Sequence, residues 1–302
     1  MPEYPDVVLY LDRVCHFACG HTLTDIHIAS PFLLRTADPP IASIAGLTLR
    51  SMERIGKRLV FVFDDDYFLV LHLMISGRLQ WRKPGAKIPG KIGLAALEFD
   101  NGTLLIMEAS SKKRAALHLV RGRDALADFD RGGLDVLTAS PEEFRAAMKR
   151  ENHTLRRALT DPRILDGIGN AYSDEILHRA RLSPVLLTDK MSDEQLDQLY
   201  EATQKTLVEW ADRLLAEAGD GFPGKVTAFH EGMAVHGRFG KPCPVCGTPV
   251  QRIKYADNET NYCPQCQTGG RLLADRGLSR LLKSDWPRSM DELDALYGRK
   301  AE

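Results

Sequence analysis

The sequence predicts an α+β protein that opens with a helix, continues through a sandwich or barrel of strands, and then turns helical before a metal-binding segment. Three observations support this fold class. Short apolar runs separated by turn residues fill the first half, helix caps and helical spacing begin near residue 140, and four cysteines fall in two close pairs near the C-terminus.

The N-terminal half begins with a helical pattern and continues with strand patterns. Val7, Leu11, Val14 and Ala18 recur at helical spacing, and Gly20 follows as a stop. After this helix come runs rich in β-branched and aromatic residues, at 58–63, 67–73 and 94–99. Evenly spaced short strands are typical of a β-sandwich or a barrel.

The middle of the chain carries helix start signals. Ser140 and Glu143 fit a capping box, and Pro141 takes the first helical position between them. A second cap at residues 192–195 opens a long helix that is expected to run to about Ala218. Turns at 161–162 and 167–169 separate shorter helices, and a short helix is expected near residues 272–283.

Composition restricts the function classes. The chain has 302 residues, 44% of them hydrophobic, enough for two domains with real cores and too apolar for a disordered chain. No run of eighteen apolar residues occurs and no positive n-region opens the chain, so we expect a cytoplasmic protein without a membrane partner. We also expect a monomer. The net charge of −1 argues against a protein that coats nucleic acid non-specifically.

Charge is distributed unevenly along this near-neutral chain. Lys and Arg against Asp and Glu number 20 to 18 in residues 1–150, 8 to 14 in 151–220, and 12 to 9 in 221–302. The acidity therefore lies in the helical middle, and the flanking parts can still form a local basic surface.

The cysteines predict one structural zinc ion. Cys243, Cys246, Cys263 and Cys266 form C-x2-C-x16-C-x2-C, a spacing that lets four thiolates converge on one tetrahedral metal across a hairpin. The alternative is four reduced cysteines in a small core, but few apolar residues lie between the pairs. Cys15 and Cys19 could form a second metal site, although small buried thiols are the favoured interpretation.

The N-terminus offers a nucleophile. Removal of Met1 would expose the secondary amine of Pro2, and an α-amino group titrates near pH 8, so a useful fraction is neutral at physiological pH. Glu3 lies next to it as a candidate general acid or base. Many proteins begin Met-Pro-Glu without such chemistry, so other motifs must support the interpretation.

Such motifs are present in order along the chain. They are Pro-Glu-Tyr-Pro-Asp-Val (2–7), Gly-Lys-Arg (56–58), His-Leu (72–73) with Ser-Gly (76–77), Gly-Ile-Gly-Asn-Ala-Tyr-Ser-Asp-Glu (167–175), Val-His-Gly-Arg (235–238) and the four cysteines. Together they resemble the formamidopyrimidine-DNA glycosylase and endonuclease VIII family of base-excision repair. The resemblance covers residues 2 to about 267.

The resemblance implies a fold with DNA bound in a cleft. It implies a catalytic β-sandwich with an opening helix at 1–138, a helix–two-turn–helix DNA-binding domain at 139–224 and a zinc-bound β-hairpin at 225–267. Residues 268–302 then form a C-terminal extension. The resemblance further implies one structural zinc ion as the cofactor of the protein and damaged DNA, expected as a duplex, as its partner.

It also implies roles for particular residues. Pro2 attacks the sugar C1′ of an extruded nucleotide, Glu3 moves protons as the sugar opens, and the resulting Schiff base permits β-elimination or β,δ-elimination. Lys57 contacts a phosphate beside the lesion, and Asp6 takes a position that is usually Glu. Asn170 holds a phosphate from the start of a helix, with a helix N-cap as the bland alternative, and Arg238 is a further DNA contact.

Two stretches depart from the family pattern in the strand-rich half. The loop at 107–116 keeps the positive charge of Lys112, Lys113 and Arg114 but lacks the aromatic wedge that reads the orphaned base. This puts selection of 8-oxoguanine opposite cytosine in doubt. Met74 and Ile75 are both candidates for the second wedge, and a buried strand residue is an equal alternative for one of them.

The zinc turn and the tail depart as well. Asn258 stands where the family has an arginine, flanked by Asp257 and Glu259, which predicts weaker phosphate binding and a slow second elimination unless Lys254, Arg252 or the tail compensates. About 35 residues follow the last cysteine; Arg276, Arg280 and Lys283 could extend the basic face, although a solvated helix is slightly favoured.

The leading hypothesis is a bifunctional DNA glycosylase and abasic-site lyase that removes oxidised or ring-opened bases through Pro2 and Glu3. The alternative is a binder of abasic or distorted DNA that does not cleave, and a zinc-ribbon adaptor for RNA or protein is a remote third. Because few cations are placed to meet phosphates, we expect binding that depends weakly on salt.

Overall fold

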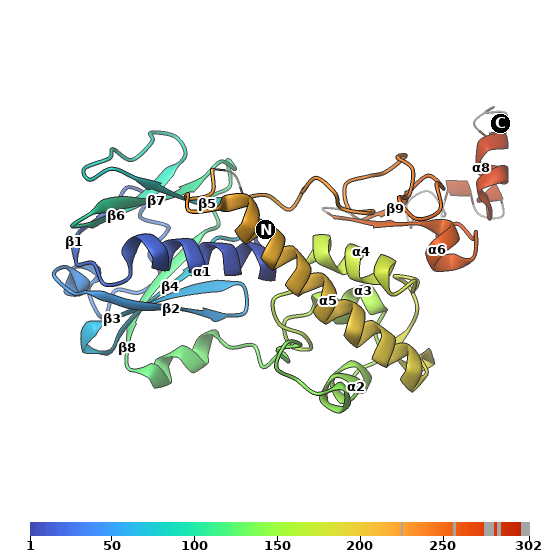
Figure 1. Cartoon of the computed structure of the whole chain (residues 1–302), viewed down its shortest axis with the longest axis horizontal. Helices are drawn as coiled ribbons and strands as arrows, with labels where there is room; N and C mark the ends of the chain where they lie inside the picture. The colour runs from blue at the N-terminus through green and yellow to red at the C-terminus, as the bar shows by residue number, and fades with distance from the viewer. Residues whose placement is uncertain (225, 256–257, 275–280, 283–284, 297–302) are drawn as a thin grey trace. The chain divides into compact units, whose positions relative to one another are not determined.

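The chain forms two compact units. A computed structural model describes residues 1–224, 226–255, 258–274, 281–282 and 285–296 (Figure 1). The first unit comprises Met1–Gly132 and Val208–Ala228, and the second comprises Gly133–Leu207 and Phe229–Glu302. The finer division at residues 138, 224 and 267 stays a prediction.

The first unit is built on two four-stranded antiparallel sheets. One has the order β1-β6-β7-β5, with β1 (Leu23–Ile28), β6 (Gly93–Phe99), β7 (Gly102–Glu108) and β5 (Gly77–Arg82). The other has the order β2-β3-β4-β8, with β2 (Leu49–Ile55), β3 (Arg58–Phe63), β4 (Tyr67–His72) and β8 (Ala116–Arg121). Helix α1 (Tyr4–Ala18) contacts β2 and β3 (Figure 1). The predicted sandwich with an opening helix is confirmed, in preference to a closed barrel.

The alternation of β3 explains why the unit is layered. Leu59, Phe61 and Phe63 enter the main core, which also takes in Val7, Tyr10 and Val14 of α1. Val60 points to the opposite face and packs with Phe68, Val70 and Leu126. Both faces of this strand are therefore covered, one by the sandwich interior and the other by a smaller cluster.

Sheet register brings site residues to one end of the second sheet. Arg58 pairs with His72 across β3 and β4, and His72 pairs with Ala116 across β4 and β8. Gly56 and Lys57 form the turn between β2 and β3, and Gly56 has a φ of +62°, a conformation that favours glycine. Lys57 is thus carried on a hairpin turn beside this row.

The second unit begins with three helices, α2 (Pro141–Lys149), α3 (Leu155–Thr160) and α4 (Asn170–Arg179). The capping box at the start of α2 is confirmed, since Glu143 N donates to Ser140 Oγ at 3.2 Å and Ser140 N donates to Glu143 Oε2 at 2.8 Å. The long helix α5 (Asp193–Ala218) ends where the sequence predicts. Its residues from Val208 onward belong to the first unit.

The zinc segment is the predicted hairpin. Strands β9 (Gln251–Lys254) and β10 (Glu259–Tyr262) pair antiparallel, and α6 (Pro264–Thr268) follows directly. Helix α8 (Met290–Leu296) was not expected. The helix predicted near residues 272–283 lies mostly outside the described residues, as do Arg276, Arg280 and Lys283, and residues 271–274 are not helical.

Four short 3₁₀ helices connect these elements within the described residues. They are η1 (Ile41–Ile44), η2 (Asp64–Asp66), η3 (Arg123–Phe129) and η4 (Thr188–Lys190). Within the described ranges, no helix has the length and apolar character needed to cross a bilayer.

Two local expectations are corrected. Asn170 is the first residue of α4, and Gly169 takes the N-cap position in its place. Gly167, with a φ of +79°, supplies the turn that admits this start. Cys15 and Cys19 are half-buried and joined by a disulfide, with their Cα atoms 4.6 Å apart, so they are not the buried thiols expected from the sequence. One turn of α1 brings the two sulfurs to the same side of the helix.

Candidate active site and nucleic-acid interface

The N-terminus of the first unit is enclosed and held by the start of α1. Pro2 is buried, and Glu3 has an exposed fraction of 2% at the N-cap of the helix. Glu3 N donates to Asp6 Oδ2 at 2.9 Å, and the two residues form a reciprocal capping box. Asp6 is fully buried, so its carboxylate fixes the backbone between the two candidate catalytic residues.

Charged groups of both signs surround this N-terminus. Burial lowers the pKa of the Met1 amine; Glu3 and Asp6 oppose this effect, and Arg78 and Lys57 add to it. The predicted residues Glu3, Asp6 and Lys57 are therefore brought together with the N-terminal segment. Arg78, at the second position of β5, was missed, although it directly follows the Ser-Gly motif at 76–77.

His72 lies in the same sheet row as Arg58, next to the Lys57 turn. Burial lowers the pKa of His72 to about 4, and the charges of Arg58 and Lys57 act in the same direction. The imidazole is consequently neutral near pH 7 and does not add to the positive charge there.

The two wedge candidates differ in exposure. Ile75 has an exposed fraction of 54%, whereas Met74 is half-buried and has a φ of +53°. Both lie in the turn between β4 and β5. Ile75 therefore presents the larger apolar surface to solvent.

Glu108 organises the loop that carries Lys112, Lys113 and Arg114. Its buried carboxylate accepts hydrogen bonds from Arg114 N at 2.8 Å, Ala115 N at 3.1 Å and Ser76 Oγ at 3.3 Å. The Lys113 ammonium donates to the Glu108 carbonyl. Lys112 and Arg114 are exposed. Of the three predicted cations, one is thus turned toward the protein and two are presented to solvent.

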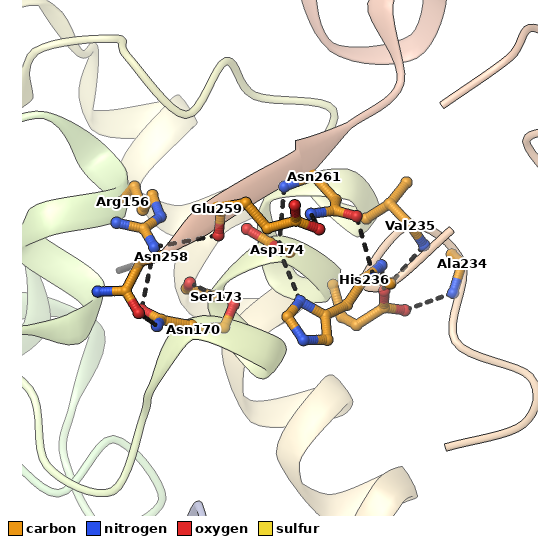
Figure 2. A network of polar contacts seen from close by, with 12 residues as sticks. Arg156, Asn170, Ser173, Asp174, Ala234, Val235, His236, Asn258, Glu259 and Asn261 are labelled. Carbon is orange, nitrogen blue, oxygen red and sulfur yellow. Dashed lines mark hydrogen bonds and ion pairs between the residues drawn. The ribbon is translucent and has the colours of Figure 1, made fainter. Parts of the chain in front are cut away.

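In the second unit, side chains from α3, α4 and the zinc hairpin meet at the start of α4 (Figure 2). Arg156 Nη2 donates to Asn170 Oδ1 at 3.0 Å, and Asn170 Nδ2 donates to Asn258 Oδ1 at 2.9 Å. Tyr255 places its ring under the Arg156 guanidinium, 5.2 Å from ring centroid to Cζ. Arg156 was not identified from the sequence. We call Arg156, Asn170, Tyr255 and Asn258 the α4 polar cluster.

The middle of α4 holds two other segments in place. Buried Asp174 accepts hydrogen bonds from His236 Nδ1 at 2.8 Å and Asn261 N at 3.0 Å, and burial raises its pKa to about 6. The Glu175 carboxylate accepts the backbone N–H groups of residues 234–236 at 2.7, 2.9 and 2.9 Å (Figure 2). Helix α4 therefore fixes both β10 and the Val-His-Gly-Arg motif.

Arg238 of that motif is bound to its own segment. Its Nη2 donates to the carbonyl oxygen of Pro242 at 3.0 Å, and its Nε is enclosed. This arrangement supports the loop that leads into the first pair of cysteines. A phosphate contact by Arg238 stays a prediction.

The four predicted metal ligands converge. The sulfurs of Cys243, Cys246, Cys263 and Cys266 all lie within 4.8 Å of one another. Among the described residues, the group consists of these four cysteines, and four thiolate ligands suit a tetrahedral structural zinc, which has no open coordination position for chemistry. The ring nitrogen Nε2 of buried His178, at the end of α4, lies 3.3 Å from Cys243 Sγ. A donor at this position would stabilise a zinc-bound thiolate.

Family models match most of the chain. The formamidopyrimidine-DNA glycosylase N-terminal domain matches residues 1–114, the H2TH domain of the same glycosylase matches 135–212, and the zinc finger found in FPG and IleRS matches 240–269. The last match contains all four cysteines, which supports their assignment as the ligands of one zinc ion.

Relatives with assigned names cover nearly the whole chain. The formamidopyrimidine-DNA glycosylases of Thermus thermophilus and Oceanobacillus iheyensis are 32% and 30% identical to it, over 89% and 88% of this chain and 100% and 98% of theirs. An uncharacterised formamidopyrimidine-DNA glycosylase-like protein of Mycobacterium tuberculosis is 42% identical over 50% of this chain and 94% of its own.

Solved structures share the fold. The Lactococcus lactis Fpg in complex with abasic-site DNA has a TM-score of 0.77 at 22% identity, over 88% of this chain and 99% of that one. A MutM complex with DNA containing carbocyclic 8-oxo-G has a TM-score of 0.77 at 22% identity, with 88% and 100% covered. With its sandwich, H2TH helices and four-cysteine hairpin all matched in order, the chain belongs to the formamidopyrimidine-DNA glycosylase family.

Proposed function

We propose that this protein is a bifunctional DNA glycosylase and abasic-site lyase that uses the amine of Pro2 as its nucleophile. The observation that carries the proposal is the enclosed N-terminus, where Glu3 caps α1 beside Asp6 and the charges of Lys57 and Arg78 act on the terminal amine. Glu3 and Asp6 also cap α1, so the support for catalysis lies in the combination of these two carboxylates with Lys57 and Arg78 around one buried amine.

The surroundings of the N-terminus suit an amine nucleophile. Removal of Met1 turns the Pro2 nitrogen from an amide into a secondary amine in the same environment. At the Met1 amine, burial lowers the pKa, Glu3 and Asp6 oppose this effect, and Arg78 and Lys57 add to it. We expect the same balance at the Pro2 amine, where a lowered pKa favours the neutral form whose lone pair attack requires. The hydrogen bond from Glu3 N to Asp6 keeps the chain direction fixed as it enters α1.

The reaction then follows from ordinary imine chemistry. The Pro2 nitrogen bonds to C1′, and the base departs with the electrons of its glycosidic bond. Glu3 is the proposed source of the proton that opens the sugar ring at O4′. The positively charged imine acidifies C2′–H, and loss of that proton expels the 3′ phosphate by β-elimination. Nothing in this sequence of steps requires the zinc ion.

The proposed substrate is damaged DNA, with oxidised or ring-opened bases as its lesion class. Support comes from the relatives, which are named formamidopyrimidine-DNA glycosylases, and from fold neighbours solved with abasic-site and 8-oxo-G DNA. Within this chain, Lys57 and Asn170 are the proposed phosphate contacts. Ile75 is the proposed wedge, because it is the more exposed of the two candidates.

We expect the base opposite the lesion to have only a weak influence on the rate of cleavage. The loop at 107–116 has no aromatic residue, and its exposed cations Lys112 and Arg114 are better suited to phosphate than to one particular base. We expect cleavage rates opposite C, G, A and T to lie within about tenfold of one another, which corresponds to roughly 1.4 kcal/mol. A strong cytosine preference in a single-turnover comparison would contradict this part of the proposal.

Borohydride trapping tests the central claim. Intact mass first establishes that Met1 has been removed, since a retained methionine blocks the amine. Wild-type protein mixed with abasic-site DNA and borohydride should give a covalent protein–DNA adduct, and Pro2→Gly should not. Pro5→Ala, which changes a proline in the first turn of α1, is the matched control and should retain the adduct.

The same assay separates the enzyme from a non-cleaving binder. The altered loop at 107–116 and the neutral Asn258 of the zinc turn favour this second candidate. Tight binding to abasic DNA with no adduct from Met1-free protein would establish the binder and exclude the lyase. If β-product forms but δ-product accumulates slowly, the expected effect of Asn258 on the second elimination is supported.

A further inference from the structure

Among the described residues, the groups that contact the positive charge of Arg156 directly are all neutral. Its half-buried guanidinium donates from Nη2 to Asn170 Oδ1 at 3.0 Å and to the carbonyl oxygen of Glu259 at 3.4 Å. Its face lies over the Tyr255 ring. An amide oxygen, a carbonyl oxygen and an aromatic ring orient a cation but do not neutralise it.

The neighbouring carboxylates form their hydrogen bonds with groups other than Arg156. The Glu259 side chain accepts from Arg252 at 3.2 Å and from Asn261 Nδ2 at 3.1 Å. Asp174 uses Oδ2 for His236 Nδ1 and Asn261 N, and its Oδ1 is buried without a hydrogen bond. The charge of Arg156 acts on this carboxyl group and lowers its pKa, but the two side chains form no direct ion pair. Within the described part of the chain, no carboxylate forms an ion pair with Arg156. A half-buried cation without a direct ion pair is stabilised when an anion binds to it.

Donor capacity also exceeds the partners available. A guanidinium offers five N–H groups, and both hydrogen bonds of Arg156 to described residues come from Nη2. The Nε atom is enclosed and has no hydrogen-bond partner. The Tyr255 stack restricts the rotamers of the side chain, so little conformational entropy would be lost when an anion binds.

We propose that Arg156 binds a DNA phosphate beside Asn170 and is the main cation of the α4 polar cluster. This inference rests on the proposed function, because it takes DNA as the ligand. The zinc turn contributes Tyr255 as the platform and Asn258 as a neutral neighbour, while the charge comes from α3. A cation held in this way compensates, from a different element, for the neutral residue in the zinc turn.

The test exploits a pair of adjacent arginines. Arg156 and Arg157 both belong to α3, but Arg157 is exposed and lies outside the cluster. Full-length, zinc-loaded, Met1-free protein is titrated into a duplex containing a tetrahydrofuran abasic analogue, with fluorescence anisotropy as the readout. Salt is varied from about 50 to 200 mM, a range over which phosphate contacts change affinity strongly.

Arg156→Gln should weaken binding by about tenfold and make the slope of log K against log salt shallower by about 0.9, the value for one lost phosphate contact. Arg156→Lys should keep most of the salt slope, because the charge remains, while losing part of the affinity. Arg157→Gln should change the slope little. Zinc content and Tm are measured for each variant.

Two results would overturn the inference. One is equal slopes for Arg156→Gln and wild type, even if affinity and Tm fall together, because that pattern describes a purely structural residue. The other is an equal loss of slope in Arg157→Gln. If Arg156→Gln misfolds, Arg156→Met, which keeps an apolar stem against Tyr255 and removes the charge, is titrated in its place, and an unchanged slope in that variant likewise overturns the inference. Failure of the proposed function is separate: it appears as missing borohydride adduct in wild type, whatever the slopes.

Discussion

The two units hold their candidate functional residues by different means. In the first, a continuous apolar core fixes α1 and both sheets, and the site residues are attached to the ends of these elements. In the second, the clusters around the zinc hairpin contain a few buried residues each, such as Val235 with Val250 and Ile253 with Tyr262. Positions there depend on hydrogen bonds from α4 and on the metal.

This difference indicates which kinds of substitution each candidate site tolerates. Apolar burial is non-directional, so the first unit can absorb small changes near its surface without moving Pro2 or Glu3. Carboxylate-to-backbone hydrogen bonds are directional, and losing one leaves buried N–H groups unsatisfied. The interface of the second unit should therefore be the more sensitive of the two to single polar substitutions and to metal loss.

Loss of the zinc ion is expected to have the largest effect, and this effect should be confined to the second unit. Cys263→Ser removes a buried ligand, and structural zinc sites in small folds contribute about 10–16 kcal/mol of metal-coupled folding. Hydrogen exchange should show lost protection in residues 240–269 while amides of β3 and β4 keep theirs. Cys15→Ser, in the first unit, is the matched control and should leave the zinc content unchanged. Loss of protection in both units would contradict the comparison.

A truncated side chain in the sandwich core should destabilise the first unit and leave the zinc hairpin intact. Phe61 is fully buried in the sandwich, and Phe61→Ala should lower the free energy of unfolding of the first unit by about 3–5 kcal/mol. Denaturant titration, with hydrogen exchange of individual segments as the readout, measures this loss of stability in the first unit. Phe32→Ala, at a side chain with an exposed fraction of 73%, should cost far less. Zinc retention by Phe61→Ala is expected and would sharpen the contrast.

A smaller effect depends on pH. His72 has a pKa of about 4 in the folded protein because it is buried, against 6.5 when exposed. The folded state binds a proton at His72 less readily than the unfolded state does. The free energy of unfolding is therefore unaffected by this histidine above pH 6.5 and decreases as the pH falls from 6.5 toward 4. At pH 5 the loss is about 2 kcal/mol.

His72→Gln should remove this part of the acid sensitivity. Urea unfolding at pH 7.5 and pH 5 measures the difference, and His27→Gln, at an exposed imidazole of β1, serves as the control. An unchanged pH dependence in His72→Gln would mean that other groups dominate acid unfolding of the first unit.

Local signals in the sequence predicted the scaffold well. The capping box at Ser140, the end of α5 near Ala218 and strand β3 all follow from patterns spanning a few residues. The four metal ligands were predictable for the same reason, since their pairwise spacing is a local property with one chemical use. The Pro2 and Glu3 assignment needed the family resemblance in addition.

Contacts between distant segments were not predictable. Arg156 meets Tyr255 and Asn170 because a helix and a hairpin approach each other, and no spacing in the sequence encodes that approach. The hydrogen bond from Arg114 N to the Glu108 carboxylate, which supports the loop at 107–116, likewise has no signal in the sequence. Arg78 was closer to prediction, since it adjoins a motif, but its effect on the N-terminal amine requires the folded sheet.

Helix α4 also has a consequence for protein design. Its first residue contacts the hairpin turn, Asp174 and Glu175 bind β10 and the 234–236 segment, and His178 reaches a zinc ligand. All of these contacts lie along one rod of ten residues, about 15 Å long. Inserting one residue within it would rotate everything beyond by about 100° and uncouple the ends. Any transplant of this interface into another scaffold must therefore copy the phase of this helix as well as its side chains.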